Sequence, residues 1–146
     1  MSEQKDLYRA YLSIAVFCEK VLIEADGVNS IIRVVDRFNV QGKTSEMPAT
    51  PLNFMLLVVF RSGFLRGKQT ISIRPKNPDG AEMPSWNFPT LFEGDNDRGV
   101  GVGAQLNIVV NKEGLYWFDV YLNDELVTRM PLRVAYQLTA IPTAGM

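Results

Sequence analysis

Hydrophobic and polar residues alternate along much of the chain with a period of two, which is the repeat of a half-buried β-strand. The segment 52–60 is apolar at nearly every position, as is typical of a strand in the middle of a fold. Turn sequences separate the segments, and no stretch shows a convincing amphipathic helix. The alternation predicts strands within residues 12–19, 32–39, 52–60, 70–74, 106–110, 116–122 and 128–134. Seven or eight such short strands predict an all-β fold, an antiparallel two-sheet sandwich of Greek-key, immunoglobulin-like type.

The N-terminal segment 7–24 is long and apolar enough to form either a helix or a strand. Its content of isoleucine, valine and phenylalanine favours a strand. In a strand with strict alternation, Leu12, Ile14, Val16 and Cys18 share one face.

The segment 116–134 predicts a hairpin whose register is set by its apolar positions. A two-residue loop at Asn123 and Asp124 would place Phe118 opposite Arg129, which is unfavourable. We therefore predict a three-residue loop, 122–124, with Asp124 in the left-handed conformation and Phe118 opposite Thr128. A β-bulge further along would restore the same alternation with the shorter loop.

The residues Gly114-Leu115-Tyr116, which lead into this hairpin, resemble the tyrosine corner of Greek-key sandwiches. That resemblance implies a hydrogen bond from the tyrosine hydroxyl back to the main chain. Phe118 stands where an immunoglobulin domain carries its second cysteine, so the likeness is to the architecture and not to a true immunoglobulin domain.

Several short motifs occur together in this chain. They are Cys18-Glu19, Asp26-Gly27 and Ser30-Ile31-Ile32 near the start, Asn77-Pro78-Asp79-Gly80 in the middle, and the stretches 113–122 and 130–134 near the end. Taken together they resemble a family of small bacterial β-sandwich domains of unknown function, over nearly the whole chain. The resemblance implies a fold, and it implies no activity, substrate or catalytic residue.

Length and charge are those of a single globular domain spanning residues 1–146. Sixteen acidic residues nearly balance fifteen basic ones, and no segment concentrates lysine and arginine, which argues against a nucleic-acid surface. The longest apolar run, 54–60, is far shorter than the roughly 20 residues of a membrane helix. With no signal-peptide pattern at the start, we expect a cytoplasmic protein without membrane contact.

The residue types limit the available chemistry. The chain has no histidine and one cysteine, which excludes histidine-based triads, cysteine-rich zinc sites and an intrachain disulfide. Cys18 lies in an apolar run and is interpreted as a small core residue. Carboxylates alone could serve a glycosidase, but no spacing selects a pair. We therefore expect neither enzymatic activity nor a cofactor.

Two loop segments suggest ligands. Glu93, Asp95 and Asp97 could supply oxygen ligands to a calcium ion, although a solvated, turn-forming acidic loop is the favoured interpretation. The glycines at 99, 101 and 103 invite comparison with a phosphate-binding loop. They lead into a strand and not into a helix, so a bulge or a close backbone approach is the better interpretation.

The outward positions of the last hairpin carry Trp117, Asp119, Tyr121, Arg129 and Arg133. Exposed aromatic side chains beside arginine are typical of interaction hot spots, unless another segment covers them. The resulting hypothesis is a non-enzymatic binding or protein-interaction module, with a protein partner or self-association through Trp117, Tyr121, Arg129 and Arg133. The alternative is a calcium- or carbohydrate-binding sandwich that uses the loop 93–97.

Overall fold

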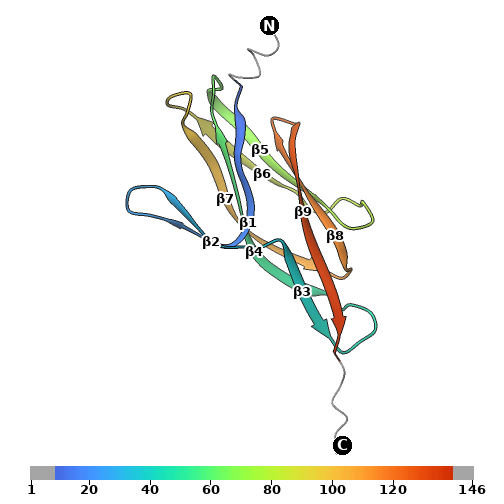
Figure 1. Ribbon diagram of the computed structural model, residues 1–146. Helices are drawn as coiled ribbons and strands as arrows, with labels where there is room; N and C mark the ends of the chain where they lie inside the picture. Colours follow the sequence, from blue (N-terminus) through green and yellow to red (C-terminus); the bar gives the residue numbers. More distant parts are fainter. Residues whose placement is uncertain (1–8, 140–146) are drawn as a thin grey trace, which may run out of the picture.

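The structure, a computed structural model, describes residues 9–139, which form nine β-strands and no helix (Figure 1). The strands are β1 (Tyr11–Ile23), β2 (Asn29–Val34), β3 (Arg37–Gly42), β4 (Thr50–Arg61), β5 (Gly67–Lys76), β6 (Trp86–Phe92), β7 (Gly99–Val110), β8 (Gly114–Leu122) and β9 (Glu125–Leu138). Within these residues no helix is long and apolar enough to cross a membrane. The prediction of an all-β fold is confirmed.

The strands form two sheets that pack face to face as a sandwich (Figure 1). One sheet has four strands in the order β2-β1-β4-β7, and the other has five in the order β3-β9-β8-β5-β6. Neighbouring strands are antiparallel except β3 and β9, which are parallel. The sandwich is therefore the predicted one, with nine strands in place of seven or eight and with one parallel pair.

Two features of the chain account for the difference in strand number. The segment 32–39, predicted as a single strand, crosses between the sheets at Val35 and Asp36, so that β2 ends in one sheet and β3 begins in the other. Strand β6 has no predicted counterpart because it contains Pro89. It lies at the edge of its sheet, where a residue without a backbone N–H is tolerated.

The N-terminal segment is a strand, but its inward face differs from strict alternation. A bulge between Leu12 and Ile14 shifts the register of β1 against β4. Leu12 and Phe17 consequently pack in the core, whereas Ile14 and Cys18 lie on the outer face of the four-stranded sheet. Cys18 is buried as expected, although beneath that outer face and not between the sheets.

The β8–β9 hairpin closes with a two-residue turn, so the prediction of a three-residue loop was wrong. Asn123 and Asp124 have positive φ angles of 50° and 66°, the pattern of a type I′ turn. A bulge between Val120 and Tyr121 then changes the register and places Phe118 opposite Met130. The bulge considered as the alternative is what keeps apolar residues opposite each other.

Aromatic rings from both sheets fill the centre of the sandwich. Phe17 of β1 and Phe54 of β4 meet Phe118 of β8, with ring centroids 5.0 Å and 6.0 Å from that of Phe118 and edge-to-face geometry. All three side chains are buried. The rings therefore join the two sheets directly, in the arrangement that aromatic pairs prefer.

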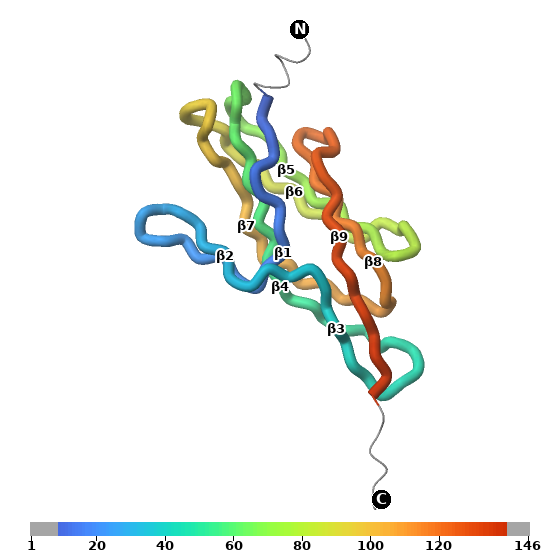
Figure 2. The backbone as a smooth tube through the Cα atoms, viewed as in Figure 1, coloured from blue at the N-terminus to red at the C-terminus, as the bar shows by residue number. Residues whose placement is uncertain are grey.

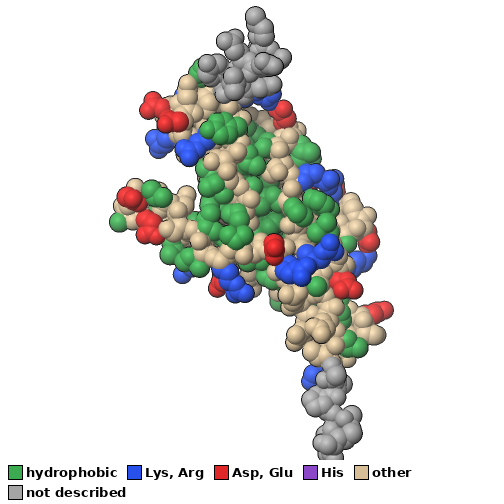
Figure 3. Space-filling view, in the orientation of Figure 1, with side chains coloured by type: hydrophobic (Ala, Val, Ile, Leu, Met, Phe, Trp, Pro, Cys, Tyr) green, Lys and Arg blue, Asp and Glu red, His purple; other side chains and the backbone are tan. Residues whose placement is uncertain are grey.

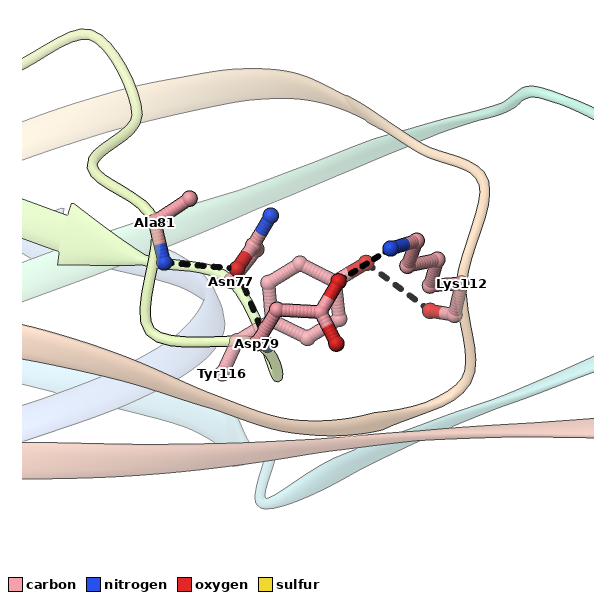
Figure 4. Close-up of polar contacts among 5 residues, drawn as sticks. All are labelled: Asn77, Asp79, Ala81, Lys112 and Tyr116. Atoms are coloured by element: carbon pink, nitrogen blue, oxygen red, sulfur yellow. Dashed lines mark hydrogen bonds and ion pairs between the residues drawn. The ribbon is translucent and has the colours of Figure 1, made fainter.

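The predicted tyrosine corner is confirmed where the chain passes from β7 to β8 (Figure 4). The hydroxyl of Tyr116 donates a 2.8 Å hydrogen bond to the carbonyl oxygen of Lys112, and burial raises the pKa of this hydroxyl. Lys112 also pairs with Asp79, which raises the pKa of the lysine. Asp79 lies in the turn between β5 and β6, where the side chain of Asn77 accepts hydrogen bonds from the backbone amides of Asp79 and Ala81. The corner thus ties the start of β8 to the neighbouring turn.

Candidate functional site

The outer face of the five-stranded sheet gathers cationic and aromatic side chains from four strands. They share one face because cross-strand partners in a ladder lie on the same side. In the strand ladders, Lys76 lies opposite Trp117, and Arg74 and Arg129 lie on either side of Asp119. Arg37 of β3 lies opposite Arg133 of β9. We call this surface the basic–aromatic face, and it consists of Arg37, Arg74, Lys76, Trp117, Asp119, Tyr121, Arg129 and Arg133.

Asp119 lies at the centre of the basic–aromatic face and is only 2% exposed. Its Oδ1 accepts a 2.8 Å hydrogen bond from Nε of Arg129, and its Oδ2 lies 3.6 Å from Nζ of Lys76. A buried carboxylate is costly unless such partners compensate it. Asp119 therefore holds two cations in place, and their side chains remain partly exposed.

Both aromatic side chains of the face lie under guanidinium groups. The Arg129 guanidinium carbon is 4.8 Å from the ring centroid of Trp117, and that of Arg74 is 4.0 Å from the ring centroid of Tyr121. These distances are within the range of cation–π interactions. Arg74 also pairs with the exposed carboxylate of Asp124. The rings are half-buried beneath these arginines.

Arg37 and Arg133 form a cationic corner at one end of the face. They are direct partners across the parallel β3–β9 ladder, and both are exposed. Within residues 9–139 neither guanidinium makes an ion pair or a side-chain hydrogen bond. Like charges placed directly opposite each other repel, so this corner favours an added anion.

A shallow pocket with a volume of about 320 Å³ adjoins the basic–aromatic face. Its lining includes Arg74, Lys76 and Tyr121 and, from the segment before β6, Glu82 and Met83. The pocket extends the face beyond the last hairpin. Its lining combines cations with the carboxylate of Glu82 and is mainly polar.

Sequence reasoning found part of this face and missed the rest. The predicted residues Trp117, Tyr121, Arg129 and Arg133 do lie together on it, and no other described segment fully covers them. Arg37, Arg74 and Lys76 were missed because they come from strands far away in the sequence. Their outward positions in alternating segments were the available signal, but strand order was needed to bring them together.

The acidic loop predicted as a calcium site lies between β6 and β7. Its backbone carbonyl groups already accept hydrogen bonds: that of Asp95 from the Ser62 hydroxyl, and that of Asp97 from the Arg61 guanidinium. Among the described residues, no three acidic, histidine or cysteine side chains gather as metal ligands. The calcium hypothesis for Glu93, Asp95 and Asp97 stays a prediction, and the contacts observed hold the loop against the turn after β4.

The three alternating glycines lie inside β7, which is an edge strand, and not before a helix. A Cβ atom at Gly101 would lie 2.6 Å from the backbone oxygen of Val58, so this glycine allows β4 and β7 to approach closely.

Burial raises the pKa of the Cys18 thiol, which disfavours the reactive thiolate.

A family model described as "Family of unknown function (DUF6941)" matches residues 13–135. The chain belongs to this family. The match covers every strand from β2 to β8 and most of β1 and β9, so the basic–aromatic face lies wholly within the DUF6941 region.

The backbones of two solved structures are similar to that of this member of the DUF6941 family. The CARDB domain of a Pyrococcus furiosus protein, solved in complex with di-metal ions, has 10% identity and a TM-score of 0.44, with 86% of this chain and 90% of that chain covered. An immunoglobulin-like protein from Pseudomonas aeruginosa has 14% identity and a TM-score of 0.36, with 86% and 96% covered. No curated protein matches the sequence.

Proposed function

We propose that the chain is a non-enzymatic protein-interaction module whose basic–aromatic face binds an acidic segment of a protein partner. The observation that carries this proposal is the composition of the face. Five cations, Arg37, Arg74, Lys76, Arg129 and Arg133, surround a single buried carboxylate on one sheet surface. Arg37 and Arg133 have no acidic partner among residues 9–139.

The arrangement of the arginines favours a carboxylate-bearing ligand. Arg129 is held by Asp119 and Trp117, so its orientation is fixed before a ligand arrives. Guanidinium groups bind carboxylates through paired, charge-assisted hydrogen bonds, and a preorganised arginine loses less conformational entropy on binding. Arginine and tryptophan are also the residue types that contribute most to protein interfaces.

A protein ligand fits the face better than a nucleic acid or a reacting substrate. The whole chain carries a net charge of −1, so a polyanion would meet repulsion beyond the face. The one carboxylate at its centre is engaged by Arg129 and Lys76, which leaves no free acid–base pair among the face residues. A short acidic segment would match the cations without requiring a long basic track.

A glutamate-rich peptide titrated against the purified chain tests this proposal. Trp117 and Trp86 are the two tryptophans, so Trp86→Phe leaves Trp117 as the fluorescent reporter of the face. We expect saturable binding, detected by fluorescence and by calorimetry, that weakens as salt is raised. A lysine-rich peptide should not bind.

Matched charge variants place the binding on the face. Arg133→Glu should weaken peptide binding about tenfold or more, because it removes one charge-assisted contact and adds repulsion. Arg98→Glu makes the same change in charge in the exposed loop between β6 and β7, away from the face, and should leave the affinity unchanged. Equal losses from both variants, no peptide binding, or tighter binding of an oligonucleotide than of the peptide would contradict the proposal.

A further inference from the structure

A two-stranded hairpin projects from the four-stranded sheet (Figures 1 and 2). Strand β1 pairs with β4 only as far as Cys18, and beyond that residue it pairs with β2 alone. We call residues 19–34 the arm. Because the arm extends past the sandwich, it contributes nothing to the core between the two sheets.

The arm exposes a concentration of aliphatic side chains. They are between 36% and 77% exposed, and they are Leu22, Ile23, Val28, Ile31, Ile32 and Val34. Figure 3 shows hydrophobic and acidic side chains together on the projecting hairpin. A two-stranded ribbon without a packed face is marginally stable in water, so this composition favours a partner that covers it.

The outer edge of the arm is open to strand pairing. Strand β2 is the edge of its sheet, and its single charged residue, Arg33, pairs with Glu19 of β1 at 3.2 Å. Proteins usually guard such edges with unpaired charges, proline or a covering segment. Strand β2 has no proline, and its one charge is already balanced within the arm. Arg33 has a positive φ of 55°, so the extended part of the edge is Asn29 to Ile32.

The charges at the two ends of β2 are complementary. The turn before β2 carries Glu24 and Asp26. After β2 the chain passes through Val35 and the exposed Asp36, and β3 then begins with Arg37 beside Arg133, so two cations outweigh one carboxylate at this end. In an antiparallel pair of identical strands, the start of each strand lies beside the end of the other. Such a pair would bring each acidic turn towards the cationic corner of the other copy, and the two-fold axis would create this contact twice.

We propose that a second copy of this chain docks on the arm, with the two β2 strands antiparallel and Ile31 and Ile32 near the two-fold axis. The aliphatic side chains of the two β2 strands become cross-strand neighbours, and Glu24 and Asp26 of each copy face Arg37 and Arg133 of its partner. This dimer rests on the proposed function, since it identifies the arm of a second copy as an acidic segment that the basic–aromatic face binds.

Charge exchange between two variants tests the dimer. One variant carries Glu24→Lys and Asp26→Asn, which keeps the side-chain oxygen that accepts the Val28 amide hydrogen bond. The other carries Arg37→Glu and Arg133→Glu. Each variant alone repels its own copy, whereas in a mixture both contacts again join opposite charges. Sedimentation velocity and native mass spectrometry should therefore show a wild-type dimer, two monomeric variants, and a mixed dimer containing one chain of each.

Control variants separate the proposed contact from general effects of charge and folding. Glu93→Lys with Asp97→Lys, and Lys68→Glu, alter exposed charges away from the arm and should leave the dimer intact. Circular dichroism establishes that each variant is folded. A further variant, Ile32→Lys, leaves the cationic corner unaltered and should also give a monomer. A monomeric wild-type chain overturns the dimer, as does a mixture of the charge variants that pairs no better than either alone.

The glutamate-rich peptide distinguishes failure of the dimer from failure of the proposed function. It is titrated against the Glu24→Lys/Asp26→Asn variant, whose own arm no longer competes for the corner. Peptide binding by this variant together with a monomeric wild-type chain overturns the dimer alone. If this variant does not bind the peptide, the proposed function fails. The dimer is then accepted or rejected on the sedimentation of the wild-type chain and of the mixed charge variants alone.

Discussion

Arg129 and Asp119 are joined by a 2.8 Å hydrogen bond from Nε to Oδ1, at a carboxylate that is almost completely buried. The same guanidinium lies over the ring of Trp117. One arginine therefore compensates a buried charge and forms part of the face that we propose binds a partner. Under that proposal, a variant of Arg129 changes both stability and binding.

Arg129→Ala should lower the free energy of unfolding by about 2 kcal/mol, because loss of one partner leaves a buried acceptor poorly compensated. Lys76, 3.6 Å from the other carboxylate oxygen, replaces only part of the lost interaction. Arg133→Ala is the matched control, since this exposed side chain makes no ion pair with the described residues and should change stability little. Urea denaturation measures both, and equal effects would contradict the role assigned to Arg129.

Tyr116→Phe should destabilise the fold by about 1 kcal/mol at neutral pH, because it removes the hydrogen bond from the hydroxyl to Lys112. The ring remains, so the packing of the core is retained. Tyr136→Phe is a suitable comparison, since that hydroxyl also donates a hydrogen bond to a backbone oxygen but at a half-buried position. A Tyr116→Phe variant as stable as the wild-type chain would show that the corner does not contribute.

Stability should fall as the pH rises above about 10, the ordinary pKa of tyrosine. Burial raises the pKa of Tyr116 in the folded chain, so the native state keeps a proton that the unfolded state loses. The contribution of the Tyr116 hydroxyl to stability is fully present below its pKa in the unfolded chain. It is lost as the pH rises through its higher pKa in the folded chain. The raised pKa of Lys112, caused by Asp79, acts in the same direction. Tyr116→Phe should therefore show a shallower loss between pH 9 and about 11.5 in urea denaturation, and an unchanged slope would contradict this assignment.

The alternating segments predicted the sandwich because local patterning records which side of a strand is buried. The inward residues of β8 and the corner at Tyr116 were predictable for the same reason. Register was less predictable, since a one-residue bulge changes the facing residues without altering composition. Such bulges shifted Ile14 and Cys18 outward in β1 and allowed the two-residue turn after Leu122.

The candidate site was only half predictable because it depends on strand order. Trp117 and Arg129 belong to one hairpin, and a local argument joins them. Arg37 and Lys76 reach the same surface only because β3 lies beside β9 and β5 lies beside β8. The arm was not predicted either, since its residues alternate like those of any edge strand. What distinguishes it is that β4 ends its pairing with β1 at Cys18.

Cys18 should resist labelling by thiol reagents in the native chain. Its side chain is fully buried beneath the outer face of the four-stranded sheet, and burial raises its pKa. Labelling should therefore follow unfolding and become complete in denaturant. A Ser13→Cys variant supplies an exposed thiol on the same strand and should react at once. Rapid native labelling of Cys18 at pH 8 would contradict the burial described.

Gly101→Ala and Gly103→Ala should have opposite effects although they are two residues apart on the same face of β7. A Cβ at position 101 would lie 2.6 Å from the backbone oxygen of Val58 and 3.0 Å from Cγ2 of Val59, so β4 and β7 would have to move apart. Forcing a methyl group into such a contact costs about 1–3 kcal/mol. At position 103 the nearest atoms are 4.0 Å away, on the side chains of Leu57 and Met55, and alanine should fit there. Because alanine restricts the unfolded chain more than glycine does, Gly103→Ala should raise the free energy of unfolding by about 0.5 kcal/mol. Urea denaturation of the two variants measures the difference, and equal destabilisation would show that strand flexibility, and not the approach to Val58, requires the glycines.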